Sequence, residues 1–251
     1  NVWTYVIQSQ QSPDQNSKTI EQHIQATHVA YANRGMQFEV QYGESVASLQ
    51  TTTVGDYNVS NLTGVIACLC ALGQRLDDAV KACQALPPVP GRMELLGVAG
   101  EPLVIVDFAH TPDAIEKALR AIQPLAVLRG GDIICVLGCG GNRDKAKRPL
   151  MAAVAETYAQ QIVLTSDNPR LEDPEAILHD MRVGLKAPQS ARVVVDRAQA
   201  IAEAVQHAQQ NDLVLIAGKG HETYQEINDV KYPFSDQLHA QQAIRNRSMH
   251  V

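Results

Sequence analysis

Four short segments of the sequence carry the side chains that could do chemistry. They are Gly138 to Lys145, Ser166 to Arg170, Gly218 to Glu222 and Asp107 to Asp113. Glycines allow tight turns that bring backbone N–H groups close to an anion, and arginine offers a planar fork of donors that suits a carboxylate. Each segment alone is also typical of an ordinary turn with solvated charges. The first, with Arg143 and Lys145, indicates an anion site for phosphate or carboxylate.

Two common nucleotide-binding motifs do not fit these segments. Gly138 and Gly140 match the first two glycines of a dinucleotide fingerprint, but Arg143 occupies the third position and would obstruct packing of helix on strand. The segment from Gly218 to Glu222 lacks the Gly-x-x-x-x-Gly-Lys-Ser/Thr spacing of a P-loop, and this spacing occurs nowhere in the printed sequence. The sequence therefore argues against a nicotinamide or flavin enzyme.

The elements that must position these segments are short apolar strands alternating with helices. Each strand is continuously apolar, which is typical of a parallel sheet covered on both faces, and ligands in such folds sit beyond the carboxyl ends of the strands. We therefore predict an α/β, Rossmann-like domain with a mostly parallel sheet. The predicted strands are Leu103 to Phe108, Asp132 to Leu137, Gln161 to Thr165, Arg192 to Val195 and Asp212 to Ala217. The predicted helices are Pro112 to Ile122, Pro149 to Ala159, Pro174 to Leu185, Ala198 to Gln209 and Asp236 to Arg245.

The first ninety residues predict a separate domain. A strand at residues 2–7 precedes a small antiparallel meander and two helices. The meander strands are expected at His28 to Tyr31, Met36 to Tyr42 and Ser45 to Val54, and the helices at Asn61 to Leu72 and Asp77 to Leu86. The proline-rich stretch from Pro87 to Gly91 cannot continue a helix, so it predicts the domain boundary, with domains at 1–90 and 91–251.

Composition excludes several classes of protein. A net charge of −6 and 4% aromatic residues disfavour nucleic-acid binding, and no apolar run approaches the ~18 residues of a membrane span. The five cysteines are odd in number and form no Cys-x-x-Cys pair, which disfavours a metal site or disulfide framework and favours a reducing, cytoplasmic location. Asn1 is not an initiator methionine, so we expect the chain to belong to a larger protein, with a cleaved or tagged chain as the alternative.

Six ordered segments resemble the Mur ligases, and in particular the branch that adds the third residue of the peptidoglycan stem peptide. They are Gly55 to Asn61, Gly91 to Glu94, Asp107 to Asp113, Gly138 to Lys145, Asp167 to Arg170 and Gly218 to Glu222.

The resemblance implies a three-domain enzyme that uses ATP and Mg²⁺. This chain would hold the tail of the central α/β ATPase domain and the whole C-terminal domain, whereas the family's P-loop, Mg²⁺-binding acid and modified lysine would lie upstream. Such enzymes form an acyl phosphate on the UDP-N-acetylmuramoyl dipeptide and join an amino acid to it, largely by positioning and charge neutralisation. Asn58 and Asn61 would contact the adenine side of ATP, Arg92 the γ-phosphate as the catalytic group, Asp107 the ribose and His110 the nucleotide edge.

The resemblance also implies the amino acid. In the family, Asp-Asn-Pro-Arg marks members that take meso-diaminopimelate, which is lysine with an extra carboxylate at its far end. This segment is Asp167, Asn168, Pro169 and Arg170; Arg143 would hold a carboxylate, and Gly218 and Glu222 the far ammonium and carboxylate region. If lysine bound instead, a buried arginine would be left without its carboxylate partner. A site of this kind can reject a ligand that lacks the partner by ~10⁴-fold or more in favourable cases.

The sequence departs from the family at two positions and leaves two alternatives open. Phe108 stands where tyrosine is usual, and Asn142 where aspartate is common. The first alternative is a related ATP ligase for another amino acid, such as the lysine-adding or D-Ala-D-Ala-adding enzymes or folylpolyglutamate synthase. The second is a non-catalytic binding module, because the P-loop is absent from the printed sequence.

Overall fold

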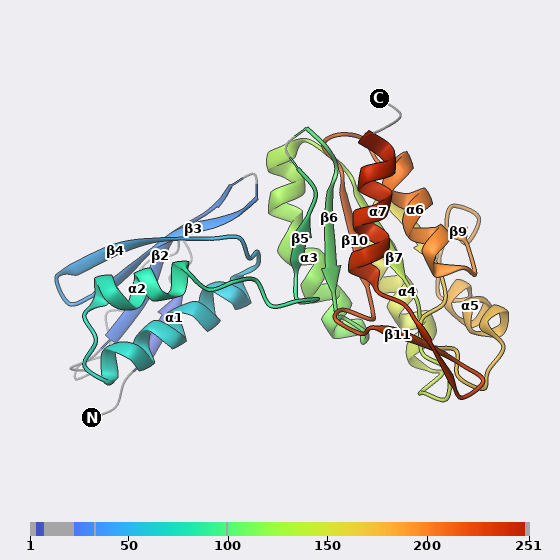
Figure 1. Cartoon of the computed structure of the whole chain (residues 1–251), viewed down its shortest axis with the longest axis horizontal. Coiled ribbons are helices and arrows are strands. Elements are labelled where there is room, and N and C mark those ends of the chain that lie inside the picture. Colours follow the sequence, from blue (N-terminus) through green and yellow to red (C-terminus); the bar gives the residue numbers. More distant parts are fainter. Residues whose placement is uncertain (1–3, 8–22, 33, 99, 249–251) are drawn as a thin grey trace. The chain divides into compact units, whose positions relative to one another are not determined.

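The computed structural model describes residues 4–7, 23–32, 34–98 and 100–248. The chain divides into two compact units, Asn1–Pro88 and Val89–Val251, with the division two residues before the predicted boundary. Figure 1 shows both as α/β units. Among the described residues, no helix combines the length and apolar character that crossing a bilayer requires.

The first unit is a four-stranded sheet with two helices packed on it. Its strands are β1 (Thr4–Ile7), β2 (His23–Ala32), β3 (Gly35–Tyr42) and β4 (Ser45–Thr51), in that order, and its helices are α1 (Asp56–Ala71) and α2 (Leu76–Gln84). β1 runs parallel to β2, and the following pairs are antiparallel, as the meander predicted. The core joins strand residues such as Ile24 and Phe38 to helix residues such as Ile66 and Val80.

Helix α1 begins five residues before the predicted start. It follows Gly55, whose φ of 97° favours glycine, and the Asn58 side chain donates a 2.8 Å hydrogen bond to the Val54 carbonyl. The residues of this first turn are mostly polar, which is typical of a loop, and the run of apolar residues that predicted the helix begins only after them. The prediction of a start at Asn61 was therefore wrong.

The second unit is built on a six-stranded sheet that is parallel except at one edge. The order is β5 (Glu94–Leu96), β6 (Leu103–Asp107), β10 (Leu213–Ala217), β7 (Ile133–Leu137), β8 (Gln161–Leu164) and β9 (Arg192–Val193). Only β5 is antiparallel to its neighbour. The prediction of an α/β, Rossmann-like fold with a mostly parallel sheet is confirmed, although the edge strand β5 was not predicted.

Helices cover both faces of this sheet. Residues of β6, β7 and β10 are buried throughout, as the continuous apolar runs predicted. One face packs against α6 (Arg197–His207) and α7 (Asp236–Ser248), for example through Val106, Val136 and Ile216. The alternate strand residues face the row formed by α3 (Pro112–Arg129), α4 (Lys147–Tyr158) and α5 (Pro174–Arg182) (Figure 1).

The position of β10 aligns the carboxyl ends of four strands. Ala217, the last residue of β10, lies in register with Asp107 of β6 and Leu137 of β7, and Leu137 pairs in turn with Leu164 of β8. The loops that leave these four ends therefore start side by side at one edge of the sheet. A separate hairpin, β11 (Tyr224–Ile227) and β12 (Val230–Pro233), follows β10 and was not predicted.

A fully buried ion pair lies beneath this edge. Arg197 at the start of α6 makes two hydrogen bonds of 2.8 Å to Asp236 at the start of α7, and both side chains are completely buried. Its remaining donors reach the carbonyls of Ser166 and Ala217, just after β8 and at the end of β10. Arg197 therefore joins two helices to two of the four strand ends.

Replacing Asp236 with alanine should destabilise the second unit by about 3–5 kcal/mol, because the Arg197 charge stays buried without its partner. Urea unfolding followed by circular dichroism measures the change. Lys117→Ala is the control, since its pair with Asp113 is solvent-exposed, and it should change stability by less than about 1 kcal/mol. Equal effects of the two substitutions would contradict a special role for the buried pair.

Candidate functional site

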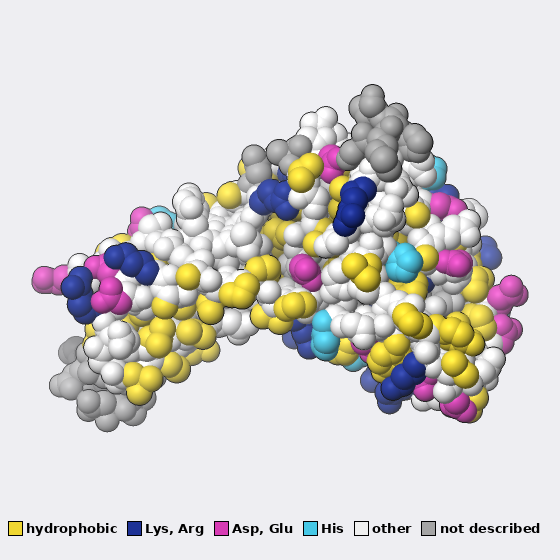
Figure 2. Space-filling view, in the orientation of Figure 1, with side chains coloured by type: hydrophobic (Ala, Val, Ile, Leu, Met, Phe, Trp, Pro, Cys, Tyr) yellow, Lys and Arg dark blue, Asp and Glu magenta, His cyan; other side chains and the backbone are white. Residues whose placement is uncertain are grey.

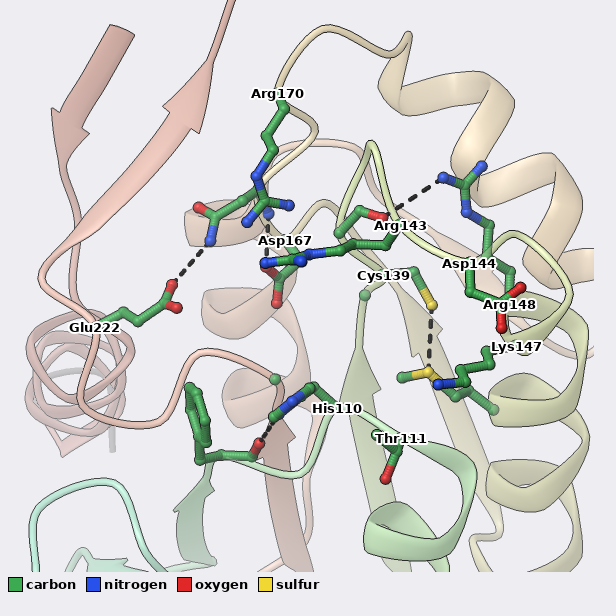
Figure 3. Close-up of a pocket in the computed structure, with 16 residues that line it drawn as sticks. His110, Thr111, Cys139, Arg143, Asp144, Lys147, Arg148, Asp167, Arg170 and Glu222 are labelled. Atoms are coloured by element: carbon green, nitrogen blue, oxygen red, sulfur yellow. Dashed lines mark hydrogen bonds between the residues drawn. The ribbon is translucent and has the colours of Figure 1, made fainter. Parts of the chain in front are cut away.

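A cavity of about 450 Å³ opens at the aligned strand ends (Figure 3). Its volume is within the ~300–1,000 Å³ that is usual for small-molecule sites. All four loops contribute to its wall. The lining residues are Phe108, His110, Thr111, Gly138, Cys139, Gly140, Arg143, Asp144, Lys147, Arg148, Met151, Asp167, Asn168, Arg170, Gly218 and Glu222.

Asn168 lies at the meeting point of three segments. Its side-chain oxygen accepts hydrogen bonds from Lys219 Nζ at 2.9 Å and from the Glu226 N–H at 2.9 Å. Its Nδ2 donates to Glu222 Oε2 at 2.8 Å. Asn168 is almost fully buried, so these bonds fix the orientation of the amide in the cavity wall.

Arg170 points into the cavity rather than into bulk water. Its side chain is 23% exposed, its Nε pairs with Glu226 Oε2 at 3.3 Å, and its Nη1 donates to the Gly141 carbonyl at 2.8 Å. Figure 3 shows its guanidinium beside Arg143, with Glu222 across the same space. The role that the family resemblance implies for Arg170 depends on this placement, because Arg143 and Glu222 are expected to hold other groups of the same amino acid.

The hairpin β11–β12 holds the Asp167–Arg170 loop in place. The Arg170 N–H donates to the Glu226 carbonyl, and the Asn228 N–H donates to the Arg170 carbonyl. Gln225 Nε2 donates to the Asp167 carbonyl at 2.7 Å. Arg170 has a φ of 53°, uncommon for arginine, so these bonds stabilise a turn that its residue type does not favour.

The glycine-rich loop packs directly against the Asp167–Arg170 loop. A Cβ on Gly141 would overlap with the carbonyl of Pro169, and a Cβ on Gly138 would overlap with that of Thr165. Pro169 thus supports the glycine loop and is not among the cavity-lining residues. Arg143 projects from this loop, exposed and without a hydrogen-bond or ion-pair partner among the described residues, so its guanidinium is available to a ligand.

Glu172 holds the glycine-rich loop in place through hydrogen bonds and an ion pair. One oxygen accepts hydrogen bonds from the Asn142 N–H at 2.5 Å and from Arg148 at 2.9 Å, and the other pairs with Lys145 at 3.2 Å. Arg148 is itself buried and also bonds Asp180 at 3.0 Å. The bonds from Arg148 and Asn142 lower the pKa of the Glu172 carboxyl to about 2.

Glu222 presents one oxygen to the cavity. Oε2 accepts from Lys219 and Asn168, each at 2.8 Å, whereas Oε1 has no partner among the described residues. Burial acts to raise the pKa of Glu222, but the hydrogen bonds from Lys219 and Asn168 outweigh it and the pKa lies below its usual value. Gly218, at a φ of 123°, allows Asp167 to approach closely, since a Cβ there would lie 2.6 Å from Asp167 Oδ2.

Asp107 organises the neighbouring loop rather than facing the cavity. Its two oxygens accept from the Met93 N–H at 2.8 Å and the Ala109 N–H at 2.9 Å, and burial raises the pKa of the carboxyl. Arg92 is exposed and lies over the ring of Phe108, 4.7 Å from its centroid. His110 lines the cavity, with Nδ1 2.6 Å from the Phe108 carbonyl oxygen.

The structure thus brings together seven of the predicted site residues around one cavity, namely His110, Arg143, Asp167, Asn168, Arg170, Gly218 and Glu222. Arg92 and Asp107 lie on adjoining segments, whereas Asn58 and the exposed Asn61 belong to the first unit. Sequence reasoning missed Glu226. It counted Arg148 among the positive charges of the glycine-rich loop and Lys219 as a loop cation, but it did not predict that they are buried supports of the site. Lys219 was visible as the cation of a glycine-flanked segment, but its burial depends on tertiary packing.

The charges of the cavity match a ligand that carries both signs. The basic residues Arg143, Lys147 and Arg170 line its wall together with the acidic residues Asp144, Asp167 and Glu222 (Figure 3). On the face of the second unit drawn in Figure 2, basic and acidic side chains are likewise interspersed, without a broad positive surface. The arrangement suits a zwitterion with separate carboxylate and ammonium groups.

Comparison with known proteins decides the family. The family model described as Mur ligase, glutamate ligase domain, matches residues 91–220, which cover every cavity-lining segment except the final Glu222. This chain belongs to the Mur ligase family.

Individual Mur ligases show the same relationship over almost the whole chain. The UDP-N-acetylmuramoyl-L-alanyl-D-glutamate–2,6-diaminopimelate ligase of Acidovorax sp. (strain JS42) is 54% identical over 224 residues, which are 89% of this chain and 45% of that protein. The enzyme of that name from Ralstonia nicotianae (strain ATCC BAA-1114 / GMI1000) is 47% identical over 91% of this chain and 44% of its own length. A solved structure of such a ligase matches 94% of this chain and 47% of its own, at 34% identity and a TM-score of 0.69. This chain therefore spans a little under half the length of these Mur ligases.

The Glu172 carboxylate should stabilise the fold in a pH-dependent way. Because its folded pKa is about 2 and its ordinary value is 4.5, its contribution is full above about pH 4.5 and disappears as pH falls toward 2. Glu172→Gln should therefore lower the free energy of unfolding at pH 7, with the difference from the parent chain shrinking across that window. Denaturant unfolding at pH 7, 4 and 3 measures this difference, and a constant difference would contradict the assigned cause.

Proposed function

We propose that this chain is the amino-acid-binding part of an ATP-dependent ligase that adds meso-diaminopimelate to UDP-N-acetylmuramoyl-L-Ala-D-Glu. The observation that carries the proposal is the Arg170 guanidinium, held inside the cavity beside Arg143 and across from Glu222. The names of its relatives support the same substrate.

The cavity offers complementary groups for three of the four charged groups of meso-diaminopimelate. Arg170 and the second N–H of Asn168 Nδ2 would bind the far carboxylate, while Glu222 Oε1 and the Gly218 backbone would bind the far ammonium. Arg143, which has no partner of its own among the described residues, would hold the other carboxylate. Arg170 keeps its pair with Glu226 in either case, but lysine would leave the guanidinium donors that face the cavity without a carboxylate, and donors shut off from water without a partner are costly.

Support for nucleotide binding is less complete in the described residues. Arg92 is exposed and not ion-paired there, so it would neutralise charge on phosphoryl oxygens. His110 at the cavity and Asp107 beside it are the proposed contacts to the nucleotide edge and ribose, and Asn58 and Asn61 those to the adenine side. ATP supplies the phosphoryl group that activates the acceptor carboxylate.

The described residues do not fit a magnesium site. Among residues 4–7, 23–32, 34–98 and 100–248, no three His, Cys, Asp or Glu side chains come together in a way that could hold a metal ion. We therefore assign no Mg²⁺ ligand to them. In this proposal the first unit is part of the nucleotide-binding domain, and the second brings the amino acid.

Replacing Arg170 with alanine should weaken meso-diaminopimelate binding by roughly 10- to 100-fold, the range expected for a lost charge-assisted contact of ~1.5–3 kcal/mol. Lysine, which lacks the far carboxylate, should bind to the variant at least as tightly as to the parent, because the variant has no arginine that needs this carboxylate. Isothermal titration calorimetry with both ligands measures these affinities.

Arg182→Ala is the matched control, because Arg182 is an exposed arginine of α5 outside the cavity. It should leave both affinities unchanged. If Arg170→Ala bound meso-diaminopimelate as the parent does, the substrate assignment would fall. Preferential binding of glutamate, lysine or D-Ala-D-Ala by the parent chain would instead favour a related ligase.

The chain by itself should bind meso-diaminopimelate without forming product, since the described residues provide no metal site. Incubating it with ATP, Mg²⁺, UDP-N-acetylmuramoyl-L-Ala-D-Glu and radiolabelled meso-diaminopimelate tests this expectation. Labelled nucleotide-linked product would show that the chain suffices for catalysis.

A further inference from the structure

Lys219 is a completely buried cation that the proposed binding contacts do not use. Its side chain is 0% exposed, although it lies in the loop that forms one wall of the cavity. Nζ donates to Asn168 Oδ1 at 2.9 Å and to Glu222 Oε2 at 2.8 Å, and it lies 5.7 Å from the centre of the Tyr224 ring. Burying an ammonium group is costly unless it is paired, so both bonds are strongly favoured.

The first bond decides which way round the Asn168 amide sits. Lys219 and the Glu226 N–H are both donors, so they select the oxygen of the amide and leave Nδ2 on the opposite side. Nδ2 then donates one hydrogen to Glu222 and has a second for the cavity. Without Lys219, the amide would lose one of the two donors that set this polarity.

The second bond decides which oxygen of Glu222 a ligand meets. Lys219 and Asn168 both hold Oε2, so Oε1 is left for the cavity. The titratable groups around this carboxylate are Lys219, Arg170, Asp167 and Arg197. Of these, Lys219 makes the direct contact with Glu222, so it has the largest part in fixing the position of the carboxylate.

We infer that Lys219 is a positioning residue for selectivity, which orients Asn168 and Glu222 so that the cavity recognises an ammonium group beside a carboxylate. It touches no substrate itself and acts through these two side chains. The inference rests on the proposed function, because it concerns the far end of meso-diaminopimelate.

Lys219→Met tests this inference, because methionine keeps most of the buried volume and removes the charge. The affinities of meso-diaminopimelate, of 2-aminopimelate, which lacks the far amine, and of lysine are measured by calorimetry. We expect the variant to bind meso-diaminopimelate at least 10-fold more weakly than the parent. The affinity for 2-aminopimelate, which keeps the Arg170 contact and has no far amine to meet Glu222, should fall by a smaller factor. The parent's preference for the ligand with the far amine should therefore shrink.

Lys231→Met is the matched control. Lys231 also lies over the Tyr224 ring, at 4.4 Å, but it is exposed and bonds neither Asn168 nor Glu222. It should keep the parent's affinities. If Lys219→Met does not fold, as judged by circular dichroism, Lys219→Gln carries the same comparison with an uncharged donor in place.

Four results would overturn the inference or its basis. Equal weakening of all ligands would show that Lys219 only supports the fold, and unchanged affinities would show that it has no role. If the parent bound none of the ligands, the proposed function would fail.

A ¹³C NMR titration of the Glu222 carboxyl then tests the Lys219–Glu222 contact by itself. The pKa of Glu222 should rise in Lys219→Met, because the hydrogen bond from Lys219 lowers it in the parent. An unchanged Glu222 titration midpoint would exclude the positioning role.

Discussion

The aligned ends of β6, β10, β7 and β8 are the constraint on which the site depends. β10 is the last of these six strands in the sequence, but it lies between β6 and β7 in the sheet. The loop that follows β10 therefore lies in the middle of this edge. Lys219 and Glu222 therefore face Asn168, which lies about fifty positions away in the sequence. One buried amide then joins the loop after β8, the loop after β10 and the hairpin that follows.

The charges at this edge are arranged in two layers with different tasks. The lower layer is buried and internally paired: Arg197 bonds Asp236, and Lys219 bonds Glu222. Such pairs add little net stability compared with apolar packing, but they fix the geometry of what lies above them. The upper layer, with Arg143, Arg170 and the second oxygen of Glu222, retains donors and acceptors for a ligand. A rigid lower layer reduces the cost of ordering the upper one when the ligand binds.

Much of this arrangement could be predicted from the sequence, for identifiable reasons. Continuous apolar runs predicted buried parallel strands, and parallel strands place their carboxyl-end loops at one edge, which brought Arg143, Arg170 and Glu222 together. The position of β10 could not be predicted, because strand order depends on packing between distant segments. The hairpin was missed although Asn228 and Asp229, both at positive φ, form the kind of turn that joins two short strands. Lys219 looked like one more loop cation, since only the folded chain shows that it is buried.

A crystal structure of this chain with meso-diaminopimelate tests the central claim most directly. The account predicts the far carboxylate within hydrogen-bond distance of the Arg170 guanidinium and the far ammonium against Glu222 Oε1, with Lys219 still bonded to Asn168. A ligand that bound outside the cavity, or whose far end lay in solvent while Arg170 contacted only Glu226 and Gly141, would contradict it.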